Sequence, residues 1–170
     1  MDIIDCLLRG HKELRRLMSA VEKCLPAQYL DAEQLRPETM EKFKQAENRL
    51  IAKLTAHEKL EQCFLVEAEK AMKPEESSCL AAVMSDHESI NDISSILSYL
   101  SGLGSEATAY SIRFAVSSFF YRINQHMNYE EKVAFPCLRR MISPARIAAA
   151  SKRAAAALEQ APQAKGHVAT

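Results

Sequence analysis

The sequence predicts an all-α protein: an up-down-up-down antiparallel four-helix bundle with a short C-terminal extra helix. Glycine is scarce, with 4 in 170 residues, and 48% of the residues are hydrophobic. The apolar residues recur at helical spacing, and no strand-like alternation is prominent. The chain is long enough for one domain with a sizeable core. Short connections between long helices favour antiparallel neighbours, which gives the up-down-up-down order.

The first two predicted helices are separated by a linker that begins with a proline. The first helix covers about residues 2–25, because Pro26 cannot continue it. The linker covers residues 26–36. The second helix begins at Pro37, a residue suited to a first helical turn, and runs to about Met72.

The third and fourth helices are bounded in the same way by prolines and glycine. The third runs from about Pro74 to Gly102, where glycine ends the helical pattern. The fourth runs from about Ser105 to about Phe135, and the prediction ends it before Pro136.

The chain divides into a bundle over residues 1–140 and a C-terminal segment over 141–170. Ser143 and Pro144 have the pattern of an N-cap and a first helical turn, so an alanine-rich helix is expected to follow them. This helix should lie outside the bundle or pack on one end, and its alanine face could contact a protein partner or a second copy. The last ten residues are expected to be loose.

The composition excludes several classes of protein. The 22 basic and 22 acidic residues cancel, so a general nucleic-acid binder is not expected. No segment approaches the roughly 20 apolar residues of a membrane helix, and the N-terminus does not resemble a signal peptide. The five cysteines include no CxxC pair and fit free thiols in a reducing cytoplasm. A basic excess from Arg139 onward is interpreted as a solvated tail, with contact to an acidic partner as the alternative.

Each predicted helix carries an apolar stripe interrupted by a histidine. The stripes are Ile4, Leu7, His11, Leu14, Met18 and Val21; Phe43, Leu50, Leu54, His57, Glu61, Phe64 and Ala68; Leu80, Val83, His87, Ile90 and Leu97; and Ile112, Val116, Phe119, Ile123, His126, Glu130 and Val133. Members lie three, four or seven residues apart, on one helix face. Two stripes add a glutamate one turn after the histidine.

The polar residues of the four stripes are predicted to lie at one height. In an antiparallel bundle, the start of the first helix lies beside the end of the second and the end of the fourth. At about 1.5 Å of rise per residue, the offsets of His11, Glu61, His87 and His126 from the neighbouring helix ends agree to within about one turn. All six side chains should therefore meet in one layer, nearer one end of the bundle.

A layer of four histidines and two glutamates predicts a metal site. A buried unpaired carboxylate costs several kcal/mol, and no lysine or arginine on the stripes lies beside Glu61 or Glu130. Two cations would neutralise both carboxylates. They would also be coordinated by the four imidazoles, those of His11, His57, His87 and His126. Mixed imidazole and carboxylate ligands suit iron, manganese or zinc.

The order of these ligands resembles the hemerythrin family in its HHE cation-binding form. A lone histidine, His11, precedes HEKLE at residues 57–61; a second, His87, precedes HMNYE at residues 126–130. The stretch HMNYEEKVAFP, residues 126–136, is similar to the last helix of that family. The resemblance covers about residues 1–140. It implies two iron ions with an oxo, hydroxo or water bridge, held by the six residues, and open positions for O2, NO or peroxide.

The departures from the family pattern bear on function. Oxygen-carrying hemerythrins have a fifth histidine on the third helix and an aspartate in the last motif, whereas Val83, Asn91 and Glu130 stand at the matching positions. The set is more similar to family members linked to sensing, NO and oxidative stress. An iron donor for iron–sulfur cluster repair, a di-iron peroxidase or oxidase, and a metal-free interaction module are the alternatives. Glu58 is interpreted as a solvated residue, with an extra metal ligand as the alternative.

Overall fold

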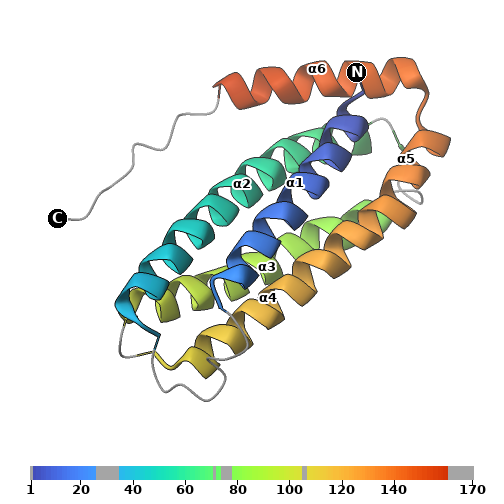
Figure 1. The fold of residues 1–170 in the computed structure, drawn as a ribbon. Helices are drawn as coiled ribbons and strands as arrows, with labels where there is room; N and C mark the ends of the chain where they lie inside the picture. Colours follow the sequence, from blue (N-terminus) through green and yellow to red (C-terminus); the bar gives the residue numbers. More distant parts are fainter. Residues whose placement is uncertain (1, 26–34, 71, 74–77, 105–106, 161–170) are drawn as a thin grey trace.

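The chain folds into an antiparallel four-helix bundle closed at one end by a fifth helix (Figure 1). The computed structural model describes residues 2–25, 35–70, 72–73, 78–104 and 107–160. The bundle helices are α1 (Ile3–Lys23), α2 (Pro37–Glu69), α3 (Ser78–Gly102) and α4 (Ala109–Tyr129), which continues through η4 (Glu130–Ala134) and α5 (Phe135–Met141); α6 (Pro144–Gln160) is the fifth helix. Consecutive helices pack side by side, α4 also contacts α1, and the described residues form no strand. The predicted fold class is confirmed.

The predicted helix positions are confirmed where the structure describes them, except for the end of the fourth helix. The second helix starts at Pro37 and the C-terminal helix starts at Pro144, as expected. The predicted start of the third helix at Pro74, most of the linker and the last ten residues lie outside the described residues. The division at residue 140 stays a prediction. No described helix is long and apolar enough to span a membrane.

The buried apolar residues form two clusters with the histidine–glutamate layer between them. The upper cluster, at the end of the bundle that holds the N-terminus of α1, includes Leu7, Phe64, Val83 and Ala134. The lower cluster, toward the other end, includes Leu14, Leu54, Ile90 and Ile123. In each helix, the residue of the layer lies between the residues of the two clusters. The layer is nearer the end that holds the N-terminus of α1 and α6 (Figure 1), as the predicted heights require.

A π-turn interrupts the fourth helix directly after the second HxxxE motif. The Phe135 amide donates to the Glu130 carbonyl, a spacing of five residues instead of four. The extra residue rotates the stripe, so that Ala134 is buried while Val133 is 43% exposed. The prediction that Val133 faces the core was therefore wrong, because it assumed one uniform helical period.

The same π-turn changes the end of the fourth helix. The prediction ended the helix before Pro136, whereas the helix continues through this proline to Met141. Proline lacks an N–H and clashes with the preceding turn of a regular helix. Here the regular ladder is already broken by the π-turn before Pro136, so the proline fits in the first turn of α5 without a further break.

Helix α6 is anchored across the end of the bundle that holds the N-terminus of α1 (Figure 1). Its Ile147, Ala150 and Ala154 belong to the upper apolar cluster. Arg139, just before it, pairs with Asp2 at 3.2 Å and with Asp5 at 2.6 Å. Arg153 pairs with Glu67 on α2 at 2.6 Å. The interpretation of this basic segment as a solvated tail was therefore wrong for these two arginines.

Glu47 is a buried carboxylate on the lower stripe of α2 that the sequence analysis did not single out. Its side chain is 2% exposed and accepts a hydrogen bond from Ser98 Oγ at 3.3 Å. Burial raises the pKa of Glu47, and the hydroxyls of Ser101 and Ser98 offset this only in part. An acid whose pKa is raised on folding lowers stability once the pH exceeds its unfolded-state pKa.

Glu47→Gln is accordingly expected to raise the melting temperature at pH 7 by roughly 2–4 °C. The gain should fade as the pH falls below the unfolded-state pKa, where both states carry the proton. Thermal unfolding of both proteins between pH 4 and pH 8 measures this. A gain that does not change with pH would show that the Glu47 charge is not the cause.

Candidate metal centre

The six residues predicted from the stripes converge in the buried layer. The layer consists of His11 from α1, His57 and Glu61 from α2, His87 from α3, His126 from α4, and Glu130 at the start of η4. None of the six is more than 7% exposed. Their ligand atoms form two groups whose members lie within 4.8 Å of one another. Each helix of the bundle thus places at least one imidazole or carboxylate at the same height.

The first group joins α2, α3 and α4. His87 Nε2 lies 3.2 Å from His126 Nε2. Glu61 Oε2 lies 3.5 Å from the former and 3.9 Å from the latter. Glu130 Oε2 is 3.6 Å from His126 Nε2. Two nitrogens and two carboxylate oxygens thus surround one point, which is a suitable donor set for one transition-metal cation.

The second group joins α1 and α2 to the same glutamate. It consists of His11, His57 and Glu130. His11 Nε2 lies 3.0 Å from Glu130 Oε2, and the two imidazole centroids are 4.9 Å apart. Glu130 belongs to both groups and is therefore the carboxylate best placed to bridge two cations. Glu61 Oε2 lies 3.8 Å from His57 Nε2, so it also approaches the second group.

Most polar atoms of the layer lack a hydrogen-bond partner. Both oxygens of Glu61, both oxygens of Glu130, His11 Nε2 and His57 Nε2 are buried without one. Within the described part of the chain, Glu61 and Glu130 form ion-pair contacts with histidines alone. Buried groups of this kind cost free energy unless a partner or a metal satisfies them. The residues therefore fit a pair of bound cations.

The protonation of the layer favours metal binding. Burial lowers the pKa of His57 to about 4, so its imidazole is neutral with a free lone pair at neutral pH. Burial and the nearby Glu61 charge raise the pKa of Glu130 well above its usual range. Burial acts in the same direction on Glu61, but the close approach of Glu130 and of the imidazoles of His126 and His87 lowers its pKa. Two like charges this close favour one shared proton, which bound cations would displace.

Two carboxylates outside the layer face the second ring nitrogens of His11 and His126, and the sequence analysis missed both. Glu131 Oε1 lies 2.9 Å from His11 Nδ1 and 2.8 Å from Arg15 Nη1. Partners of this type fix the tautomer and the direction of a ligating imidazole. The spacing in the sequence could have indicated this contact. Arg15 stands one turn after His11, and Glu131 is the second residue of the doubled glutamate in the last motif.

A similar arrangement lies on the opposite side of the layer. Asp86 Oδ2 is 3.7 Å from His126 Nδ1, and Asp86 Oδ1 accepts a hydrogen bond from Arg122 at 2.8 Å. Arg122 stands one turn before His126, mirroring Arg15 and His11. One imidazole on each side thus has an arginine-held carboxylate behind it, although the contact to His126 is longer than a hydrogen bond.

Glu131→Gln is expected to weaken metal binding by about 10–100-fold with little change in the helical content. The amide keeps the shape but loses the charge that orients His11 and pairs with Arg15. Titration of the metal-free protein with Fe(II) or Co(II) measures the affinity. Lys132→Gln, at the exposed neighbouring position, is the control, and equal affinities for the two variants would contradict this role.

Glu58 is buried, contrary to its interpretation as a solvated residue. Its side chain is 7% exposed and Oε1 has no hydrogen-bond partner. Burial raises its pKa, while the charges of His87 and His126 oppose this. Glu58 does not belong to either ligand group, so the geometry places a third carboxylate at the edge of the layer without making it a ligand.

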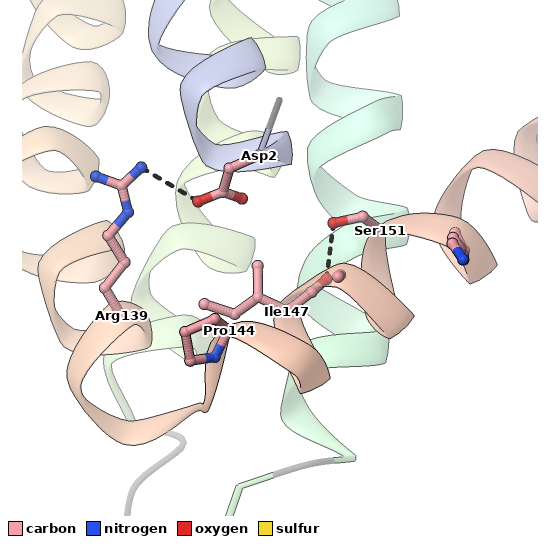
Figure 2. A pocket seen from close by; sticks show the side chains of 7 residues that line it. Asp2, Arg139, Pro144, Ile147 and Ser151 are labelled. Carbon is pink, nitrogen blue, oxygen red and sulfur yellow. Dashed lines mark hydrogen bonds and ion pairs between the residues drawn. The ribbon is translucent and has the colours of Figure 1, made fainter.

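The layer approaches the surface at His57. A hollow of about 370 Å³ between α1 and α2 is lined by Cys6, Arg9, Gly10, Glu13, Lys53, Ala56, His57 and Leu60. Lys53 and Glu13 pair across it at 2.6 Å. Gly10 is required here, because a Cβ at this position would lie 2.5 Å from His57 Nδ1. A second hollow, of about 660 Å³, lies beside Arg139 and α6 and contains none of the six residues (Figure 2).

Fold and site together define a helical-bundle protein with a buried histidine–carboxylate cluster that can hold metal ions. The family description "Hemerythrin HHE cation binding domain" matches residues 2–138. The chain therefore belongs to the hemerythrin family. Neither the curated proteins nor the solved structures contain a match to it.

Proposed function

We propose that this chain is a non-haem di-iron protein that binds or reacts with O2, NO or peroxide, in sensing or stress protection in the cytoplasm. The observation that carries the proposal is the convergence of unpartnered ligand atoms. Four carboxylate oxygens and three histidine nitrogens of the layer are buried without a hydrogen-bond partner. One carboxylate, Glu130, belongs to both groups.

The assignment of roles follows from the geometry. His87 and His126, with Glu61 and Glu130, would hold one iron; His11 and His57, with Glu130, would hold the other. Ligand chemistry alone also suits manganese or zinc, and iron is preferred because of family membership. Bound iron would supply a redox-active Lewis acid. Six protein side chains do not fill twelve positions of two six-coordinate ions, so positions remain for solvent and a small ligand.

The surrounding residues restrict what can reach the layer. Apolar clusters above and below it exclude water and large substrates. The hollow lined by His57 and Gly10 brings a molecule from solvent up to a layer residue. Glu131 and Arg15 hold the ring of His11. These features favour a small ligand over an organic substrate.

An iron count combined with absorption spectra tests the proposal. Anaerobically purified protein is expected to contain two iron ions per chain. In air, an oxo-bridged ferric pair should give charge-transfer bands in the near ultraviolet, and NO added to the ferrous protein should change the spectrum. His126→Ala should lose both the iron and the bands. Protein without bound iron would refute the proposal; ready transfer of iron to an apo-protein would favour the donor, and peroxide turnover the enzyme.

A further inference from the structure

The outer surface of α3 and α4 is poor in charge from residue 93 onward, beyond the exposed Glu88 and Asp92 of α3. From residue 93 to residue 129 the only Asp, Glu, Lys or Arg residues are Glu106, Arg113 and Arg122, although such residues make up 26% of the chain. Glu106 lies outside the described residues. Arg113 donates to the Leu25 carbonyl at 2.6 Å, and Arg122 pairs with Asp86 at 2.8 Å. Both described arginines are therefore already engaged within the chain.

The same surface exposes large apolar side chains. Tyr99, Tyr110, Phe114 and Tyr121 are 66–67% exposed, and Ile96 is 56% exposed. Positions 110, 114 and 121 share one face of α4, and positions 96 and 99 share one face of α3. A surface hollow joins the two helices, because Ile93 of α3 lines it together with Phe114 and Tyr121 of α4. We call these five exposed residues the α3–α4 patch.

The α3–α4 patch combines projecting rings with a depression. The hollow, of about 420 Å³, is lined by Ile93, Phe114, Ser117, Ser118, Tyr121 and Arg122. Rings that project beside a depression allow a surface to fit a copy of itself. Helix α6 packs on α2 and α1, on another part of the bundle, and leaves this patch uncovered (Figure 1).

We propose that the α3–α4 patch is the interface of a homodimer with two-fold symmetry. In such a dimer each patch contacts the same patch of the other copy. A charged patch would therefore meet a patch of the same charge and be repelled, whereas a patch poor in charge would not. Aromatic enrichment and depletion of charge are typical of interface centres. With about 200 Å² for each aromatic side chain, the exposed fractions offer roughly 600 Å² per copy. A standard interface buries about 800 Å² per partner, including its rim.

Other occupants fit less well. An anionic membrane surface or a nucleic acid would need free basic residues, and the two described arginines of this region are engaged. Ile147, Ala150 and Ala154 of α6 already pack in the upper apolar cluster, and a contact through the rest of this helix stays a separate prediction. The dimer does not depend on the proposed di-iron function, since the six layer residues lie in the interior and not in the patch.

Sedimentation velocity of the full chain from about 1 to 100 µM tests the dimer. The wild-type protein is expected to sediment at twice its chain mass of 19.0 kDa. Phe114→Glu should raise the dimer dissociation constant roughly 100-fold or more, because it places a buried charge in each half of the interface. Tyr110→Ser combined with Tyr121→Ser removes apolar area without adding charge and should also weaken the dimer.

Val66→Glu is the matched control, because Val66 is an exposed apolar residue on α2, 41% accessible and outside the patch. It should leave the dimer unchanged. Far-UV circular dichroism and metal content should be the same in all variants. A monomeric wild-type protein over the whole range would overturn the proposal and point to a different partner. A dimer that survives both patch variants, or dissociates with Val66→Glu, would also overturn it.

Discussion

A variant in which Glu61 and Glu130 are both replaced by leucine is expected to bind no iron and to be more stable than the metal-free wild-type protein. Both glutamates are 0% exposed, and none of their four oxygens has a hydrogen-bond partner. Replacing buried ionic groups by apolar side chains of similar volume often stabilises a protein by about 1–4 kcal/mol. The metal-free wild-type protein should therefore have a lower free energy of unfolding than the variant, because its two buried carboxylates lack cations.

Metal analysis and thermal unfolding, with and without Fe(II), separate the two effects. Iron should raise the melting temperature of the wild-type protein and leave that of the double variant unchanged. At 170 residues, about 2 kcal/mol corresponds to roughly 4–8 °C. Replacing the exposed Glu22 and Glu69 by leucine is the control, and it should retain iron. Iron bound by the layer variant would show that the two carboxylates are not ligands.

The bundle could be predicted from the sequence because its stripes are nearly continuous. Every apolar residue named for the first three stripes is buried. The layer could be predicted because each ligand interrupts an apolar stripe, and helical rise fixes its height within a turn. Only the end of the fourth stripe failed. The π-turn at Glu130–Ala134 shifts the register by one residue, and no local signal in the sequence marks it.

What could not be predicted depends on contacts between distant segments. Glu131 and Asp86 look like surface acids until α1 and α4 place an imidazole beside each of them. The role of Gly10 depends on the separation of α1 and α2 at His57, which helix periodicity does not specify. The α3–α4 patch follows the helical period, but its exposure depends on which face the neighbouring helices leave uncovered.

Gly10→Ala is expected to remove one of the two metal ions. The added Cβ would lie 2.5 Å from His57 Nδ1 and 2.9 Å from His57 Cε1. Real Cβ contacts of this length essentially never occur, so the imidazole must move. His57 is 6% exposed and lies against α1, which leaves its ring little room to move without leaving the layer. The group with only three residues, His11, His57 and Glu130, would then lose one of them.

The measurement is the number of iron ions per chain, which should fall from two to about one, with affinity at the weaker position reduced by at least about 100-fold. Gly102→Ala is the matched control, because Gly102 also lies in a helix and a Cβ there would meet nothing within 4 Å. Since alanine favours a helix over glycine by roughly 0.5–1 kcal/mol, both variants gain helix propensity. Only the position beside His57 should therefore lose metal. Two iron ions retained by Gly10→Ala would mean that His57 does not need its place against α1 to hold the metal.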